Sequence, residues 1–174
     1  MRRMSDDPET DHVGRVHALW RREIPDVSLD GSAILARARR VTLMTRDKVM
    51  PVLARHGLDS GEFYVLAALR RAGPPYALRP TELFRALMVS SGGLTDRLRR
   101  LEERGLVRRI PSQEDRRSML VELTAKGRRL VEKAWREDMD VENAIVANLS
   151  RQERQELARL LARLAQVMEQ ESET

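Results

Sequence analysis

The sequence predicts a mainly α-helical fold with a small β-hairpin. Apolar residues recur at helical spacing over most of the 174 residues, whereas the alternation typical of strands is confined to residues 107–123. A hydrophobic content of 41% and the absence of low-complexity tracts indicate one compact domain, or a domain with dimerising arms.

The N-terminal part predicts two helices. Residues 12–23 carry an apolar side formed by Val13, Val16, Leu19 and Trp20. Pro25 ends this helix, and helical spacing resumes in a long amphipathic helix that should be interrupted or end at residues 51–57. Such a length indicates packing against a partner.

A third helix should begin after Asp59. The carboxylate of Asp59 can accept from the backbone N–H groups of the first turn, and Glu62 three residues later completes a capping box. Apolar residues follow at helical spacing, and the run Gly73-Pro74-Pro75 ends the helix.

Two short helices follow, separated by a tight turn. Pro80 can begin the first of them because that position needs no amide donor. Ser90 can cap the second, whose apolar stripe is formed by Leu94, Leu98 and Leu101. This is the arrangement of a helix-turn-helix.

The opposite face of the second short helix is polar and rich in arginine. It carries Gly92, Asp96, Arg99, Arg100 and Glu103, with Thr95 at its flank. Gly92 and Gly93 would each cost about 1 kcal/mol relative to alanine in a helical turn, so we interpret them as permitting close approach of backbone amides to a phosphate. Thr95, Asp96 and Arg99 can then reach base edges in a major groove. The alternative is that Ser-Ser-Gly-Gly forms only a loose turn.

A β-hairpin follows this helix. Gly105 stands where a helix ends with a left-handed residue, and residues 107–110 and 118–123 predict two strands around a turn. From Arg97 to Arg129 the chain carries eleven basic and five acidic residues, whereas the net charge of the whole chain is +5. The positive charge is therefore concentrated in the helix-turn-helix and the hairpin, which favours a polyanionic partner.

The C-terminal part predicts two more helices. Thr124 can cap the first, and Ser150 with Glu153 forms a capping box for the last. The last helix carries a strongly apolar stripe, formed by Leu157, Leu160, Leu161, Leu164, Val167 and Met168. Because leaving this stripe in water is unfavourable, we expect a homodimer; the alternative is that these helices pack within one chain.

Composition excludes several classes of site. The chain has no cysteine, which excludes disulfides, thiolate nucleophiles and zinc–thiolate sites. The three histidines, His12, His17 and His56, lack metal-ligand spacing, and we expect them at the surface. With no signal core and no apolar run of about 18 residues, we expect a cytoplasmic protein without a membrane partner. No nucleophile or glycine-rich phosphate loop accompanies the acidic pairs, so we expect neither an enzyme nor a cofactor.

The segments SSGGLTDRLRRLEERGLVRR and EDRRSMLVELTAKG resemble the winged helix-turn-helix of the MarR family of bacterial transcriptional regulators. The Asp-Arg-Arg tip of the hairpin and the Leu-Thr-x-x-Gly junction carry this resemblance. It implies that Arg117, braced by Asp115, enters the minor groove, where negative potential attracts a guanidinium. The predicted DNA-binding residues are Ser90, Ser91, Gly92, Gly93, Thr95, Asp96, Arg99, Arg100, Asp115, Arg116 and Arg117.

The segments WRREIPDVSL and GEFYVLAALRRAGPPYALRPTEL further resemble the urate-responsive branch of that family, whose members carry an extra N-terminal helix. The resemblance implies a ligand site at Trp20, Arg97 and Arg109. Tyr64 stands where this branch has an aspartate, which leaves room for another aromatic or phenolic anion. Arg97 also lies close to the apolar stripe of its helix, where a cation requires an anion. The alternatives are a tryptophan in the core and an arginine that snorkels or pairs with Glu62.

We therefore expect a winged helix-turn-helix protein with dimerisation helices at residues 1–57 and 125–174 around a DNA-binding domain at residues 58–124. Its function would be that of a homodimeric repressor that binds a pseudo-palindromic operator in double-stranded DNA and is released by a small aromatic or anionic effector. Two alternatives remain. One is a ligand-binding or protein-interaction module without specific DNA binding, and the other is a sequence-indifferent architectural protein, which predicts salt-dependent binding without base discrimination.

Overall fold

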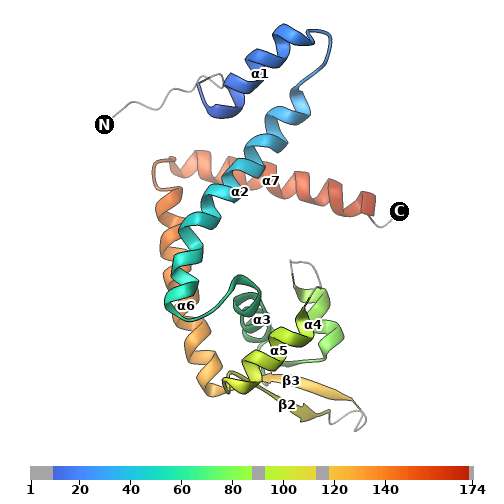
Figure 1. The fold of residues 1–174 in the computed structure, drawn as a ribbon, viewed down its shortest axis with the longest axis vertical. Coiled ribbons are helices and arrows are strands. Elements are labelled where there is room, and N and C mark those ends of the chain that lie inside the picture. The colour runs from blue at the N-terminus through green and yellow to red at the C-terminus, as the bar shows by residue number, and fades with distance from the viewer. Residues whose placement is uncertain (1–9, 88–92, 113–117, 173–174) are drawn as a thin grey trace. The chain divides into compact units, whose positions relative to one another are not determined.

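The structure, a computed structural model, describes residues 10–87, 93–112 and 118–172. It is mainly helical with a small antiparallel sheet, as the sequence predicts (Figure 1). The chain divides into two compact units, one ending at Lys48 and one beginning at Val49. None of the helices in the described ranges combines the length and apolarity that crossing a membrane needs.

The first unit consists of α1 (His12–Glu23) and the beginning of α2 (Asp30–Arg55). The carboxylate of Asp11 accepts from the Gly14 amide at 2.7 Å and from Arg37 of α2 at 3.0 Å. His17 is buried and its Nε2 lies 2.9 Å from the hydroxyl of Ser32. The expectation that every histidine lies at the surface is therefore wrong for His17, because its ring closes the contact between α1 and α2.

The helix α2 ends within the expected range, at Arg55. Pro51 lies inside it and does not end it. Val52 and Leu53, the next two residues, are each only 1% exposed in the second unit. Their burial stabilises the last turn of α2 and compensates for the amide hydrogen bond that proline cannot donate.

The second unit is built around α3 (Ser60–Arg71). This helix packs against α4 (Pro80–Ala86), α5 (Leu94–Glu103) and α6 (Ala125–Ile145). The capping box predicted at its start is present, because Asp59 accepts from the Glu62 amide at 2.8 Å and Glu62 from the Asp59 amide at 3.2 Å. The most deeply buried large side chains of this core include Leu53, Phe63, Val65, Leu66, Leu69, Leu83, Leu101 and Leu106.

The sheet has three strands in the order β1-β3-β2. The predicted hairpin is formed by β2 (Val107–Pro111) and β3 (Met119–Leu123), with Val107 paired to Leu123 and Arg109 to Val121. The additional strand β1 (Ala77–Leu78) pairs with β3 on its other side. Two residues are too few to display an alternating pattern, so β1 escaped prediction.

The junction between β3 and α6 explains the Leu-Thr-x-x-Gly motif. The hydroxyl of Thr124 accepts from the Gly127 amide at 3.0 Å and donates to the Gly105 carbonyl at 2.8 Å. Gly127 lies so close to the strand that a Cβ on it would be 2.1 Å from the Leu106 carbonyl oxygen. Threonine therefore caps α6, and glycine allows the start of α6 to touch the backbone before β2.

The last helix, α7 (Arg151–Ser172), begins with the predicted capping box between Ser150 and Glu153. Its apolar stripe remains exposed in the single chain, where Leu157, Leu160, Leu161, Val167 and Met168 are 47–55% exposed. This stripe is the kind of apolar surface that soluble proteins cover with a partner.

Candidate nucleic-acid interface

The helix α5 begins at Leu94, later than the sequence suggested. Gly93 is its N-cap, with a left-handed φ of +86°, and not a residue of the first turn as expected. Only glycine adopts this conformation readily, which explains Gly93 better than helix propensity does. The remaining predicted residues of this turn, Ser90, Ser91 and Gly92, lie outside the described residues. No described side chain caps α5, so its first amides have no side-chain acceptor among the described residues.

The exposed side of α5 faces an open hollow that it shares with α4. The hollow has a volume of about 800 Å³. Its walls are formed by Pro80, Thr81, Phe84 and Arg85 of α4 and by Gly93, Leu94, Thr95, Asp96 and Arg99. Thr95, Asp96 and Arg99 are exposed, whereas Leu98 and Leu101 on the opposite side are buried in the core. The predicted division of α5 into a core side and a polar side is therefore confirmed.

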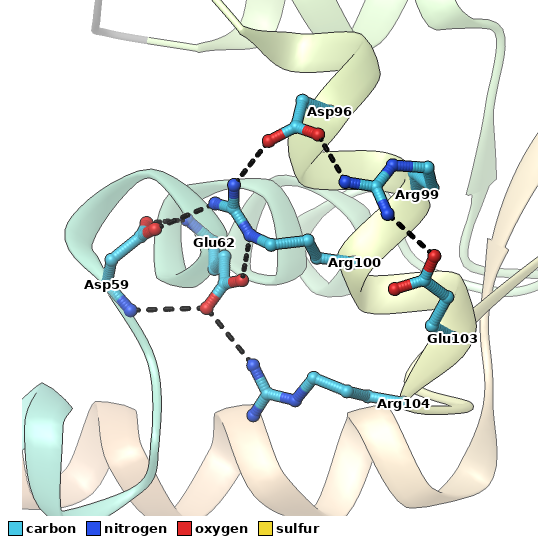
Figure 2. Close-up of polar contacts among 7 residues, drawn as sticks. All are labelled: Asp59, Glu62, Asp96, Arg99, Arg100, Glu103 and Arg104. Carbon is cyan, nitrogen blue, oxygen red and sulfur yellow. Dashed lines mark hydrogen bonds and ion pairs between the residues drawn. The ribbon is translucent and has the colours of Figure 1, made fainter.

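Seven charged side chains connect α3 and α5, as Figure 2 shows. We call them the α3–α5 ion-pair network; its members are Asp59, Glu62, Asp96, Arg99, Arg100, Glu103 and Arg104. Its centre is Glu62, whose side chain is only 6% exposed and which pairs with Arg100 and Arg104 at 3.1 Å each. The sequence indicated Glu62 as a capping residue but not as the centre of a network.

The exposed part of this network lies along α5. Asp96 pairs with Arg100 at 2.5 Å and with Arg99 at 2.6 Å, and Arg99 pairs with Glu103 at 2.7 Å (Figure 2). The Arg99 guanidinium, followed by Arg100, lowers the pKa of Asp96 below its ordinary value. Asp96 is therefore ionised near neutral pH, and it orients the two arginines that flank it.

The tip of the hairpin, with Asp115, Arg116 and Arg117, lies outside the described residues. The strands that lead to it carry two further arginines. Arg108 pairs with Glu122 across the hairpin, and Arg109 lies 3.3 Å from Glu102 of α5. The cations at the base of the hairpin thus have carboxylate partners on β3 and α5.

The predicted ligand residues occupy different surroundings. The guanidinium of Arg97 lies against Gly61 of α3, where its Nε would be 2.2 Å from a Cβ on that glycine. Its Nη1 is buried and has no hydrogen-bond partner in the described part of the chain. Arg97 does not pair with Glu62. The two carboxylate oxygens of Glu62 instead accept hydrogen bonds from the Asp59 amide, Arg100 and Arg104. Arg109 lies at the surface of the hairpin base.

Tyr64 and Trp20 are both partly exposed. Tyr64 is 38% exposed on α3, and burial, together with the nearby charges of Asp138 and Glu142, raises the pKa of its phenol. Trp20 belongs to the first unit, where it is 51% exposed and lines a groove of about 460 Å³ between α1 and α2.

Sequence reasoning missed Asp138, because its place on α6 has no distinctive motif. It is only 4% exposed, and its Oδ1 has no hydrogen-bond partner among the described residues. Burial raises the pKa of its carboxyl, and the charge of Glu142 adds to this effect. In the described ranges, histidines and carboxylates form no cluster of three or more that could hold a metal ion.

Comparisons with known proteins agree with this architecture. A sequence model of the MarR family matches residues 56–118. The chain is 37% identical over 145 residues to the HTH-type transcriptional regulator PecS of Dickeya dadantii, an alignment that covers 83% of this chain and 87% of PecS. These relatives are transcriptional regulators, which agrees with the expectation that the chain is not an enzyme.

Two solved structures extend the comparison. A point mutant of MarR from E. coli, solved in complex with operator DNA, has a TM-score of 0.66 and 27% identity, covering 84% of this chain and 97% of MarR. BpsR of Bordetella bronchiseptica, whose DNA binding is regulated by 6-hydroxynicotinic acid, has a TM-score of 0.66 and 25% identity over 76% of this chain and 92% of BpsR. The chain therefore belongs to the MarR family and is a winged-helix, DNA-binding regulator of transcription.

Proposed function

We propose that this regulator is a homodimeric repressor that binds a pseudo-palindromic operator and is released by a small aromatic or anionic ligand. The exposed polar side of α5, with Thr95, Asp96 and Arg99 beside the left-handed Gly93, carries the DNA-binding part of this proposal. The likeness to a MarR mutant solved with operator DNA supports it.

In the proposed complex, α5 lies in the major groove. Thr95, Asp96 and Arg99 contact base edges, and the amides that follow Gly93 approach a phosphate. The segment Ser90–Gly92 completes this contact. The hairpin reaches the adjacent minor groove, into which Arg117 is inserted. Asp115 braces Arg117, and Arg116 lies beside the DNA backbone.

The proposed dimer is formed by residues 1–57 and 125–174 around the DNA-binding part at 58–124. The exposed stripe of α7 supports this division, since burying each of its large apolar side chains contributes about 1.5–3 kcal/mol. A two-fold axis would place two copies of α5 about 34–36 Å apart, one turn of DNA. Analytical ultracentrifugation tests this part of the proposal, and a stable monomer at micromolar concentration would contradict it.

The residues that we assign to effector binding are Arg97, Tyr64 and Arg109 of the second unit and Trp20 of the first unit. The supporting observation is the Nη1 of Arg97, which is buried without a hydrogen-bond partner among the described residues, because a buried N–H donor is unfavourable without an acceptor. Membership of the urate-responsive branch is part of this proposal, but the phenol of Tyr64 favours another aromatic acid over urate itself. The regulation of BpsR by 6-hydroxynicotinic acid is in keeping with an effector of that class.

One selection experiment tests the DNA-binding proposal. The full chain is incubated with a pool of random duplexes, and bound sequences are amplified over several rounds. We expect enrichment of a pseudo-palindrome whose half-sites are about 10 base pairs apart. Equal affinity for the selected and a scrambled duplex would contradict sequence-specific binding; if that affinity depends steeply on salt, an architectural binder is indicated instead.

Effector release is tested with the selected duplex. Urate, 6-hydroxynicotinate and benzoate are titrated against the complex while fluorescence anisotropy of the duplex is recorded. We expect at least one acid to release the wild-type protein but not Arg97→Met, which keeps the apolar stem and lacks the guanidinium. If no acid releases the wild-type protein, the effector part of the proposal fails. Transcription from a promoter that overlaps the selected site tests repression, which predicts lower output when the protein is added.

A further inference from the structure

Glu62 differs from the other members of the α3–α5 ion-pair network in its burial. Its side chain is 6% exposed, whereas those of Arg100 and Arg104 are 38% and 37% exposed. Its Oε1 accepts from the Nε of Arg100, and its Oε2 accepts from Nη1 of Arg104 and from the Asp59 amide. A buried carboxylate that loses such partners is left with an uncompensated charge, so these contacts are expected to persist when DNA binds.

Arg100 is the most fully paired arginine of the network. Its Nε, Nη1 and Nη2 each contact a different carboxylate, from Glu62 at 3.1 Å, Asp96 at 2.5 Å and Asp59 at 2.9 Å (Figure 2). The network contains four carboxylates and three guanidinium groups, so its net charge is negative. A phosphate is therefore disfavoured beside Arg100, and three of the five N–H donors of Arg100 are already engaged with carboxylates.

Arg99, the next residue, is placed differently. Both its partners, Asp96 and Glu103, belong to its own helix and are 52% and 59% exposed. Ion pairs between exposed side chains contribute little to stability, so Arg99 can exchange them for a base edge. Asp96 contacts both arginines and thereby connects the buried part of the network to Arg99.

We propose that Glu62 and Arg100 are positioning residues for sequence recognition. Glu62 and Asp59 hold Arg100, Arg100 holds Asp96, and Asp96 orients Arg99 toward the base edges, while Arg100 itself makes no contact with DNA. Arg100 lies on α5, and Arg104, the C-cap of α5, lies one turn further along. Both pair with Glu62, so the two contacts fix the rotation of α5 about its own axis relative to α3. This inference rests on the proposed sequence-specific binding.

The experiment compares full-length variants on the duplex selected by the wild-type protein. Glu62→Gln keeps the shape of the side chain and an oxygen for the Asp59 amide, but removes the charge. Arg100→Gln removes the guanidinium that pairs with Glu62. Arg99→Ala is the reference for the loss of a base contact. The matched control is Glu132→Gln, which breaks the ion pair at 2.7 Å between Glu132 of α6 and Arg70 of α3 and changes no residue of α5. Thermal unfolding confirms that each variant is folded at the assay temperature.

Affinities are measured for the selected duplex, a scrambled duplex and all single base-pair variants, over a series of salt concentrations. We expect Glu62→Gln and Arg100→Gln to reduce the preference for the selected duplex by about tenfold, within the range attributed to one bidentate base contact. The loss should fall at the same base pairs as in Arg99→Ala, and the dependence of affinity on salt should remain that of the wild type. Glu132→Gln should keep the wild-type preference.

Three results would overturn the inference. Arg100 contacts a phosphate if Arg100→Gln weakens binding to every duplex equally and makes the slope of log affinity against log salt concentration shallower by about 0.9 per protein subunit. If Glu62→Gln keeps the wild-type preference, Glu62 does not position α5. If the wild-type protein itself does not discriminate between duplexes, the proposed function fails and this inference fails with it. In the double variant Glu62→Gln/Arg100→Gln, a loss no larger than that of either single variant supports one shared mechanism.

Discussion

Replacing Gly127 with alanine tests the packing of the start of α6 against Leu106, just before β2, and Leu123 of β3. The new Cβ would lie 2.1 Å from the carbonyl oxygen of Leu106 and 2.9 Å from Cδ1 of Leu123. The Leu106 carbonyl cannot move freely, because it accepts from the Thr124 amide at 3.1 Å, and the Thr124 hydroxyl lies at the same distance from it. Overpacking of this kind costs about 1–3 kcal/mol, and the better helix propensity of alanine offsets at most about 1 kcal/mol.

We therefore expect Gly127→Ala to lower the free energy of unfolding by about 1–2 kcal/mol, which corresponds to a fall in Tm of roughly 2–8 °C for a chain of this size. Circular dichroism during thermal and urea denaturation measures both quantities, at one fixed protein concentration because association would change the apparent stability. Gly31→Ala is the control, since this helical glycine has no atom within 4 Å of the added Cβ. Its stability should be unchanged or slightly higher. If Gly127→Ala is as stable as the wild type, the close contact with Leu106 does not explain the glycine.

Three further changes have defined outcomes. Thr124→Ala should lower the free energy of unfolding by about 1–2 kcal/mol, because the Gly127 amide loses its acceptor. Thr124→Ser keeps a hydroxyl and should retain most of the wild-type stability; urea denaturation of both variants measures the difference. Burial raises the pKa of Asp138, so its charged form destabilises the folded state as pH rises above about 3.8. Asp138→Asn should therefore be more stable than the wild type at pH 7, with a gain that shrinks as pH falls toward 3.8; an equal gain at both pH values would refute this. Arg117→Ala should weaken binding to all duplexes and lower the salt slope, and an unchanged affinity would exclude the proposed minor-groove contact.

Local signals in the sequence were sufficient for most of the helices and for the hairpin. Asp59 with Glu62, Pro80, Thr124 and Ser150 were all predicted as the starts of helices, and each begins a helix in the structure. Capping depends on a side chain and an amide only two or three residues away, so the sequence contains the whole interaction. The strands β2 and β3 were predicted for a similar reason, since five residues suffice to display alternation.

Where prediction failed, the missing information was non-local. The burial of His17 depends on Ser32 of the next helix, and the strand β1 exists because β3 lies beside it. The start of α5 at Leu94 could not be read from Ser90 alone, because glycine at the cap can adopt a conformation that a side chain would forbid. None of these outcomes is encoded within a few residues of the position concerned.

In the candidate site, too, some features depend on local sequence and others on tertiary contacts. The sequence by itself determined that α5 has an apolar side toward the core and a polar, arginine-rich side, since one helical period assigns each residue to a side. It could not determine which of those arginines are available to a ligand. Only the tertiary structure decided that Arg100 is held by carboxylates at the start of α3, that the guanidinium of Arg97 lies against Gly61, and that Arg99 remains at the surface. The physical reason is that a guanidinium side chain is long enough to reach a neighbouring helix, and its partner there lies about forty residues away in the sequence.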